Sequence, residues 1–318
     1  MYMIVYVTGC LGFIGRHITQ LFLDKGWYVY GIDSCTYASD ITLLEKWNSY
    51  SKFKFEKKNI CDLDRLVDCD YFINVAAETH VDNSIRDSKV FIDSNIYGVH
   101  NILELLKIYK KEGYVVPKLI HFSTDEVYGD IENGEHFETD ILKPSNPYSA
   151  SKAAADQLIT AWSRTYGIPY NIIRPTNNYG IGQYTEKLIP KACKFIGLER
   201  KIPLHNLGKP IRNWLNAKDT AAAVEAIILY GNDNEIYNVA GGFEQSNIDT
   251  IKKVLNAYFG CNIENYNDYV NFGIERPGQD IRYALNDDKI RSLGWSPKCN
   301  FDEEIKIIVA YYKDNFLW

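Results

Sequence analysis

The 318-residue sequence has no long hydrophobic run and no excess of positive charge. A membrane-spanning helix needs about 18 or more consecutive apolar residues, and no such stretch is present. Lys and Arg number 35 against 41 Asp and Glu, which gives a formal charge of -6. Nucleic acids and anionic lipid surfaces bind fields of Lys and Arg, so we expect neither a nucleic acid nor a membrane as partner.

The sequence also lacks the cysteine and histidine spacings of metal sites and disulfide frameworks. Its seven cysteines are odd in number and include no C-x-x-C pair, and its six histidines include no H-x-x-x-H pair. We therefore expect no disulfide framework and no bound metal. The first residues show no basic leader followed by a long apolar stretch, so no secretory signal is predicted. These absences together favour a soluble, cytoplasmic protein.

The first half of the chain alternates short apolar runs with helical patterns. Strands are predicted at Ile4–Thr8, Trp27–Asp33, Lys52–Lys57, Tyr71–Ala76, Lys118–Ser123 and Tyr170–Arg174, and helices at Phe13–Lys25, Ser94–Lys111 and Tyr148–Tyr166. This alternation predicts an α/β fold, a doubly wound parallel sheet covered by helices on both faces.

After residue 180 the pattern loosens. Helices are expected at Thr185–Gly197, Ala217–Tyr230, Ser246–Phe259 and Phe301–Asn315, with short strands and loops between them. We expect residues 1–180 to form the main domain and residues 181–318 a smaller C-terminal substrate-binding lobe over the carboxyl edge of the sheet. Some strands and helices of the second segment are expected to return to the first domain.

A glycine-rich loop follows the first predicted strand and opens the first predicted helix. It reads Thr8-Gly9-Cys10-Leu11-Gly12-Phe13-Ile14-Gly15, with glycines spaced G-x-x-G-x-x-G. Glycines at such a turn let the backbone approach a pyrophosphate at the start of a helix. Its place between a strand and a helix predicts dinucleotide binding.

An acidic residue, Asp33, ends the second predicted strand. A carboxylate there accepts hydrogen bonds from ribose hydroxyls and repels a 2′-phosphate, and Ser34, Cys35 and Thr36 offer no guanidinium to bind that phosphate. The cofactor is therefore predicted to be NAD rather than NADP. Asn59 and Ile60 follow the third strand, where they are expected to meet the adenine.

Two motifs carry candidate catalytic groups. Tyr148 and Lys152 stand four residues apart at the start of a helix, so they share one face, and an adjacent ammonium and the positive nicotinamide ring lower the pKa of a tyrosine toward that of a base. Thr124, Asp125 and Glu126 end the fifth predicted strand, where side chains point into the ligand crevice. This triplet offers a hydrogen-bond donor, an acid and a base.

These motifs resemble the nucleotide-sugar branch of the extended short-chain dehydrogenases, and the chain is similar to dTDP-glucose 4,6-dehydratases over essentially its whole length. The resemblance is carried by the Gly9–Gly15 loop, Ala76-Ala77-Glu78-Thr79-His80-Val81-Asp82, Ser123–Gly129, Tyr148–Lys152, Arg174–Gly180, Glu186-Lys187-Leu188-Ile189-Pro190, Arg212-Asn213-Trp214-Leu215 and Arg276-Pro277-Gly278. It implies a Rossmann-type NAD-binding domain in which Ala76, Ala77, Tyr148 and Lys152 also contact the cofactor.

The resemblance implies a reaction and a role for each catalytic residue. Tyr148 takes the proton of the sugar 4-hydroxyl while NAD⁺ oxidises C4, with Lys152 and Thr124 in support. Glu126 removes the proton on C5, and Asp125 protonates the departing 6-hydroxyl. In enzymes that use two neighbouring carboxyls, one is often protonated and acts as the acid while the other is ionised and acts as the base.

The resemblance also implies a set of substrate contacts and an oligomeric state. The nucleotide-diphosphate hexose is expected to contact Thr124, Asn178, Lys187, Leu188, Pro203, His205, Arg212, Asn247 and Arg276. Arg212 and Arg276 could clamp the diphosphate bidentately. A homodimer is expected through a four-helix bundle formed by Ser94–Lys111 and Tyr148–Tyr166.

Several alternatives stay open on the sequence alone. His205 stands where the family often has Tyr, and Gln279 stands where it has His, so both thymine and uracil nucleotides remain candidates. A 4-epimerase or a decarboxylase of the same superfamily shares most of the pattern, although an epimerase has no use for the Asp125 and Glu126 pair. A non-catalytic NAD-binding protein is the third alternative.

Overall fold

A computed structural model describes residues 2–274 and 280–315 of the chain. Its centre is a seven-stranded sheet in the order β10-β6-β5-β4-β1-β2-β3, in which every neighbouring pair of strands is parallel. The strands are β1 (Ile4–Thr8), β2 (Tyr28–Asp33), β3 (Phe53–Lys57), β4 (Tyr71–Asn74), β5 (Lys118–Phe122), β6 (Tyr170–Pro175) and β10 (Glu235–Val239). All six predicted strands are present, and their bounds agree with the prediction to within two residues.

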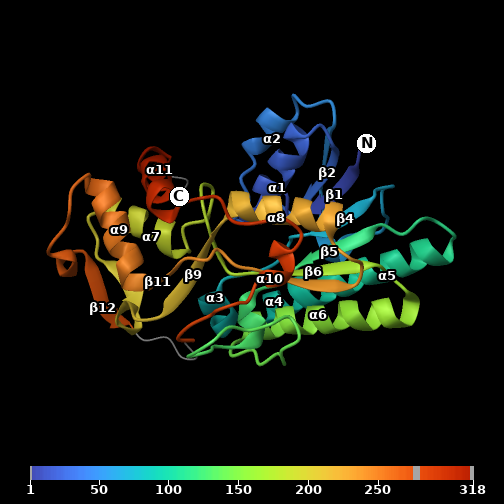
Figure 1. Cartoon of the computed structure of the whole chain (residues 1–318). Helices are drawn as coiled ribbons and strands as arrows, with labels where there is room; N and C mark the ends of the chain where they lie inside the picture. Colours follow the sequence, from blue (N-terminus) through green and yellow to red (C-terminus); the bar gives the residue numbers. More distant parts are fainter. Residues whose placement is uncertain (1, 275–279, 316–318) are drawn as a thin grey trace.

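Helices cover both faces of this sheet, which confirms the predicted doubly wound α/β fold (Figure 1). The helices of the sheet domain are α1 (Phe13–Asp24), α2 (Leu43–Trp47), α3 (Val81–Arg86), α4 (Lys89–Phe91), α5 (Gly98–Lys111), α6 (Pro147–Tyr166), α8 (Ala217–Tyr230) and α10 (Asp288–Arg291). Side chains alternate along β1: Val5 and Val7 pack in the core under α1 and α8, whereas Tyr6 packs in the core under α5. The strands are therefore buried on both sides.

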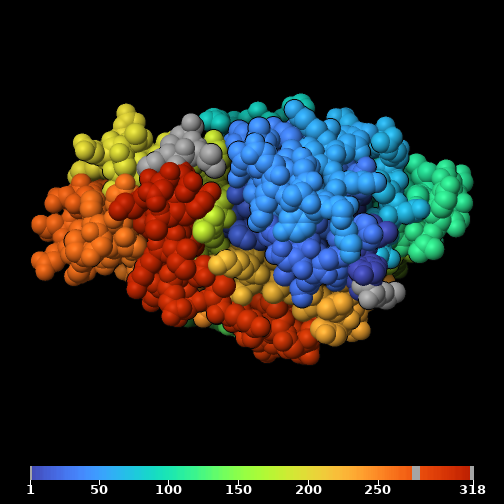
Figure 2. All heavy atoms as spheres, turned by 90° about the horizontal axis from the view of Figure 1, so that it is seen from above, coloured from blue at the N-terminus to red at the C-terminus, as the bar shows by residue number. Residues whose placement is uncertain are grey.

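A smaller lobe stands beside the carboxyl edge of the sheet, at the left of both Figure 1 and Figure 2. It contains two short sheets, in the orders β11-β9-β7 and β12-β8, and a core of its own. Its elements are β7 (Asn177–Tyr179), α7 (Leu188–Gly197), β8 (Ile202–His205), β9 (Ile211–Asn216), β11 (Glu244–Ser246), α9 (Asn247–Phe259), β12 (Val270–Ile274) and α11 (Phe301–Asp314).

Three elements beyond residue 180, namely α8, β10 and α10, belong to the sheet domain by their contacts, and Ile290 of α10 packs in the sheet-domain core. Helix α8 packs in the same core as α1, and β10 pairs with β6 as the outermost strand. The sequence prediction included the α8 helix with its observed bounds but did not include β10, a five-residue strand in a loosely patterned segment. Among the described residues, no helix is long and apolar enough to cross a membrane.

Candidate active site

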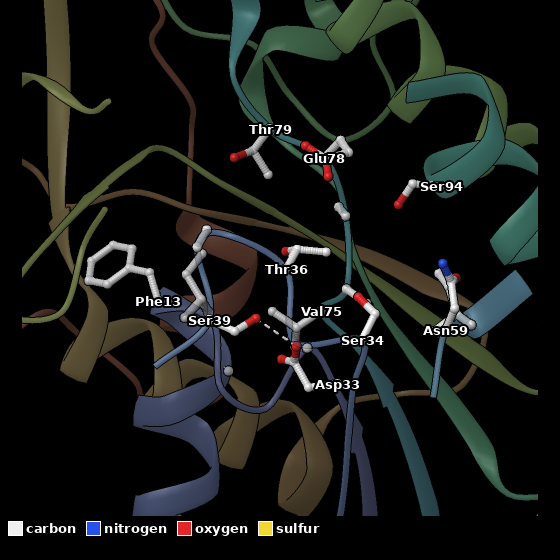
Figure 3. A pocket seen from close by; sticks show the side chains of 18 of the residues that line it. Phe13, Asp33, Ser34, Thr36, Ser39, Asn59, Val75, Glu78, Thr79 and Ser94 are labelled. Carbon is white, nitrogen blue, oxygen red and sulfur yellow. Dashed lines mark hydrogen bonds between the residues drawn. The ribbon is translucent and has the colours of Figure 1, made fainter. Parts of the chain in front are cut away.

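A cavity of about 440 Å³ lies at the carboxyl edge of the sheet, between the loops that follow β1, β2, β3 and β4 (Figure 3). Every predicted cofactor residue except Tyr148 and Lys152 lines it, namely Gly9, Gly12, Phe13, Ile14, Gly15, Asp33, Asn59, Ile60, Ala76 and Ala77. From the smaller lobe, Gln183, Tyr184, Glu186 and Lys187 complete its wall. The cavity is thus enclosed by segments far apart in the sequence.

The glycine loop has the close backbone packing that its spacing predicts. A Cβ on Gly15 would lie 2.0 Å from the Gly9 carbonyl oxygen, and Gly9 itself has a positive φ of 67°. Helix α1 begins just after Gly12, which has no side chain to cap it. The first-turn N–H groups therefore face the cavity without a competing side-chain acceptor, and this arrangement fits a dinucleotide pyrophosphate.

Asp33 is held firmly at the end of β2. One carboxylate oxygen accepts hydrogen bonds from the Cys35 backbone N–H at 2.8 Å and the Ser39 hydroxyl at 2.7 Å, and the other accepts from the Leu11 N–H at 3.0 Å (Figure 3). These bonds fix a negative charge on the cavity wall, where it disfavours a 2′-phosphate. Asn59 uses its side-chain oxygen to accept from the Cys61 N–H at 2.9 Å, which orients its amide beside the same cavity.

The five predicted catalytic residues come together from two elements. Tyr148 and Lys152 lie on the first turns of α6, while Thr124, Asp125 and Glu126 follow the carboxyl end of β5. The Thr124 hydroxyl donates to Asp125 Oδ1 at 3.0 Å and also hydrogen-bonds with Tyr148. Thr124, Asp125, Tyr148 and Lys152 are all buried, with exposed fractions of 7% or less.

The two adjacent carboxyls have different surroundings. Burial and repulsion by Glu126 raise the pKa of Asp125 to about 7, and Asp125 Oδ2 is buried without a hydrogen-bond partner. Burial also raises the pKa of Glu126, but the Arg212 cation, a hydrogen bond with Asn146 and the Lys187 cation all oppose that rise. Asp125 is therefore suited to hold a proton and Glu126 to accept one.

Tyr148 and Lys152 are perturbed mainly by burial. Loss of water and the neighbouring Glu126 charge raise the pKa of Tyr148, although the hydrogen bond with Thr124 opposes this. Burial lowers the pKa of Lys152 to about 8, against the attraction of Asp156. The protein's own side chains thus do not supply the lowered tyrosine pKa that the Tyr–Lys spacing suggested, because desolvation of the phenolate outweighs the favourable contacts.

A second cavity, of about 170 Å³, adjoins the first and lies toward the smaller lobe. The two cavities share Thr79, Gln183, Glu186 and Lys187. Glu126 lines the second cavity together with most of the predicted substrate residues, namely Asn178, Lys187, Leu188, Pro203, His205, Arg212 and Asn247. Thr124 does not line it, and Arg276 lies outside the described residues.

The guanidinium of Arg212 is partly occupied by hydrogen bonds within the protein, so not all of its donors are available to a diphosphate. Its guanidinium donates to the backbone oxygens of Ile211 at 2.7 Å, Ile281 at 3.4 Å and Asp280 at 3.2 Å. It also stacks over the Tyr283 ring at 4.6 Å. Three of the five N–H donors of an arginine are therefore occupied by backbone oxygens, and two remain for a ligand or for Glu126.

The sequence reasoning missed several residues of this site. Asn146 hydrogen-bonds to Glu126 from the helix start, and Glu186, Asp280 and Tyr283 line the second cavity. A signal for Asn146 was present, because an Asn directly before Pro147 is typical of a helix N-cap with Pro in the first turn. The described residues contain no group of three His, Cys, Asp or Glu side chains placed to hold a metal ion.

The doubly wound sheet, the glycine loop and the buried Tyr148–Lys152 pair define the extended short-chain dehydrogenase class. Within that class, the family model described as GDP-mannose 4,6 dehydratase matches residues 6–308. The chain is 37% identical to a probable dTDP-glucose 4,6-dehydratase of Sinorhizobium fredii, over 99% of this chain and 94% of the relative. It is 35% identical to the dTDP-glucose 4,6-dehydratase of Haemophilus influenzae, over 98% of each. The chain belongs to this family of nucleotide-sugar 4,6-dehydratases.

Solved structures show the same relationship. The dTDP-glucose 4,6-dehydratase DesIV of Streptomyces venezuelae, crystallised with NAD and dTDP, superposes with a TM-score of 0.91 at 33% identity and 98% coverage of both chains. A UDP-glucuronic acid 4-epimerase of Bacillus cereus, crystallised with NAD and UDP-glucuronic acid, gives a TM-score of 0.89 at 25% identity, with 98% of this chain and 99% of that chain covered. Because dehydratase and epimerase share the fold, the choice between these reactions depends on the site residues.

Proposed function

We propose that the protein is an NAD-dependent 4,6-dehydratase that converts dTDP- or UDP-glucose to the 4-keto-6-deoxy sugar nucleotide. The observation that carries this proposal is the pair Asp125 and Glu126, adjacent in sequence but with carboxyls in different electrostatic surroundings. Elimination of water needs both an acid for the leaving hydroxyl and a base for the C5 proton. A 4-epimerase needs neither.

The first cavity has the chemistry to hold NAD. The first-turn N–H groups of α1 would bind the pyrophosphate, Asp33 would accept from the adenosine ribose, and Asn59 and Ile60 would contact the adenine. Ala76 and Ala77 provide a wall without bulky side chains. When bound, NAD⁺ supplies oxidation at C4 and later reduction at C6, and its positive ring favours an ionised Tyr148.

The side chains divide the proton transfers among themselves. Tyr148 accepts the proton of the sugar 4-hydroxyl, with Thr124 hydrogen-bonded to it and the Lys152 cation one helical turn away. The 4-ketone acidifies the C5 hydrogen, which Glu126 removes as a proton. Asp125 gives its proton to the 6-hydroxyl, so that the C6–O bond breaks and water leaves. After reduction at C6, a proton returns to C5, which completes the balance of one water lost.

The second cavity is proposed to hold the nucleotide diphosphate. Lys187 and Arg212 are cations on its wall, while Pro203, Leu188 and Asn247 offer apolar and amide contacts for the sugar and base. Asn178 is held by Thr176 and Thr220 through its amide. His205 lines the same cavity and would lie at its nucleotide end, where it would bear on the choice between thymine and uracil.

Three further expectations complete the proposal. A homodimer would form through α5 and α6, which pack against each other along one face of the sheet (Figure 1). Residues 1–180 would form the cofactor-binding domain and residues 181–318 the nucleotide-sugar-binding lobe, apart from α8, β10 and α10, which pack with the sheet domain. The protein would act in the cytoplasm.

A single comparison tests the function. Purified protein is incubated in parallel with dTDP-glucose, with UDP-glucose and with a glucuronate nucleotide, and the products are followed by mass spectrometry. The expected product has lost the mass of one water, and the faster substrate identifies the preferred base. A product of unchanged mass but altered configuration would identify an epimerase, loss of CO2 from a glucuronate nucleotide would identify a decarboxylase, and unreacted substrates would indicate a non-catalytic protein.

A further inference from the structure

Asn146 makes hydrogen bonds in two directions at the start of α6. Its side-chain oxygen accepts from the Ser149 N–H at 3.0 Å, and the Ser149 hydroxyl reciprocates by accepting from the Asn146 N–H at 3.2 Å, which forms a capping box. Its amide nitrogen donates to Glu126 Oε2 at 3.3 Å. Asn146 is itself buried, with 7% of its surface exposed.

We propose that Asn146 is a positioning residue, which fixes the Glu126 carboxylate relative to the helix that carries Tyr148. This inference rests on the proposed function, in which Glu126 is the C5 base. One end of the amide is bonded to the α6 backbone and the other to Glu126, so a single planar group joins the carboxyl end of β5 to the start of α6. Tyr148 follows Asn146 by only two residues.

The proposed reaction requires Tyr148 and Glu126 to be held in a fixed arrangement. Tyr148 works on the oxygen of C4 and Glu126 on the hydrogen of the neighbouring carbon, so both groups must meet adjacent atoms of one bound sugar. A base that is misplaced by a fraction of its hydrogen-bond length loses rate without losing substrate binding. An amide that is fixed at both ends keeps the two groups in register without using a group that itself titrates.

Asn146 also belongs to the charged surroundings of Glu126. Arg212 on β9 and Lys187 before α7 favour the Glu126 carboxylate, whereas Asp125 beside it and Asp280 oppose it, and Tyr148 and Tyr283 are the neighbouring phenols. Asn146 is the uncharged member of this set that donates an N–H to the carboxylate. Such a bond favours the ionised form, which is the form a base needs.

A purely structural role, that of a helix cap, makes different predictions. Asp and Ser are both good N-cap residues, so Asn146→Asp and Asn146→Ser should preserve the cap. Asp has the same shape as Asn but replaces the N–H donor by an oxygen, which repels Glu126. Ser is too short to reach across. The matched control is Asn300→Asp, because Asn300 caps α11 through the same kind of bonds to the Asp302 and Glu303 N–H groups, in the smaller lobe.

The test measures kcat and KM against pH, the solvent deuterium gained at C5 in heavy water, and the thermal midpoint of each variant. We expect Asn146→Asp to move the acidic limb of kcat up by about one to two pH units and to lower kcat at neutral pH by about tenfold or more, with KM nearly unchanged. Asn146→Ser should do the same to a smaller extent. Deuterium entry at C5 should slow in parallel, and the change in thermal midpoint should match that of Asn300→Asp.

The results distinguish failure of the positioning role from failure of the proposed function. If the wild-type enzyme releases water but the Asn146 variants keep its acidic limb and its C5 exchange, the positioning role is wrong. The same conclusion follows if their activity falls only in proportion to lost folded protein. If the wild-type enzyme releases no water from either glucose nucleotide, the proposed function fails instead.

Discussion

Thr124 and Asp125 are joined by a hydrogen bond in which the hydroxyl donates to Oδ1 at 3.0 Å, while Oδ2 of the same carboxyl is buried with no partner. A buried oxygen without a donor is costly if the carboxyl is ionised, and less so if that oxygen carries a proton. Burial is accordingly the main cause that raises the pKa of Asp125 to about 7.

The first prediction separates oxidation from elimination. Asp125→Asn should leave oxidation at C4 largely intact but slow the loss of water by about 10² or more, since an amide cannot protonate the leaving hydroxyl. After rapid mixing with substrate, NADH absorbance should rise and persist. Tyr148→Phe should show almost no rise. Equal loss of the signal in both variants would argue against separate roles.

The second prediction concerns the pH dependence of the same step. Asp125 must be protonated to act, and its protonated fraction falls as pH rises through about 7. The elimination rate measured in single turnover should therefore decline above neutral pH, and the decline should be absent in Asp125→Asn. If the decline at high pH is unchanged in Asp125→Asn, a group other than Asp125 causes it.

The second prediction extends to stability, which depends on the protonation of the same Asp125 carboxyl. Its pKa is raised from 3.8 in a free carboxyl to about 7 in the folded protein, so the stabilisation it contributes is complete below about 4 and is lost as pH rises through 7. Asp125→Asn should then be more stable than the wild type at pH 8, by on the order of 2 kcal/mol, and the gain should shrink toward pH 5. Urea unfolding at both pH values measures this difference, and a variant less stable at pH 8 would contradict it.

Much of the candidate cofactor site was predictable because its residues fall in short contiguous segments. The glycine loop occupies one turn between β1 and α1, and Asp33 ends the next strand, so a local pattern determines both positions. The bounds of β1 and α8 were predicted as observed for the same reason. A short sequence window contains everything that those predictions need.

The remainder depends on contacts between distant segments. Three N–H donors of Arg212 bind the backbone oxygens of Ile211, Asp280 and Ile281. Asp280 and Ile281 lie 68 and 69 residues away from Arg212 in the sequence, so no local pattern indicates these bonds. Asn146 was recognisable as a helix cap, but its bond to Glu126 joins residues 20 positions apart. The raised pKa of Tyr148 likewise comes from burial that only the folded chain creates.

The third prediction tests the cofactor. Purified protein should carry NAD without any being added, and Asp33→Asn should retain it about tenfold less strongly, because the charged acceptor for Leu11, Cys35 and the ribose is lost. Ser39→Ala removes one donor to Asp33 but keeps the charge, so its effect should be smaller. The dinucleotide released on denaturation is identified by chromatography, and recovery of NADP would overturn the assignment.

The fourth prediction concerns a buried ion pair behind the site. Arg174 contacts Asp156 Oδ2 at 2.9 Å and the Tyr128 hydroxyl at 2.6 Å, and both charged groups are almost fully buried. Arg174→Met should destabilise the protein by about 3–5 kcal/mol, because the buried Asp156 carboxylate loses the cation that contacts it and keeps only the attraction of Lys152. The double variant Arg174→Met with Asp156→Asn should recover part of that loss. The free energy of unfolding of both variants is measured in denaturant. If the double variant is no more stable than Arg174→Met, loss of the ion pair does not explain the destabilisation.

The last prediction follows the hydrogen that starts on C4. If Tyr148 and NAD⁺ oxidise C4 and the same cofactor later reduces C6, a glucose nucleotide deuterated at C4 should give a 4-keto-6-deoxy product with the label in its methyl group. In heavy water with unlabelled substrate, removal of the C5 proton by Glu126 should instead place solvent deuterium at C5. The proposed cofactor cavity is lined by the sheet domain and by Gln183, Tyr184, Glu186 and Lys187 of the smaller lobe, so the label should not pass between molecules. A mixture of fully labelled and unlabelled substrate checks this by mass spectrometry. Label returned to C4 would identify an epimerase, and label in free NADH would identify an ordinary dehydrogenase, so either result excludes the dehydratase.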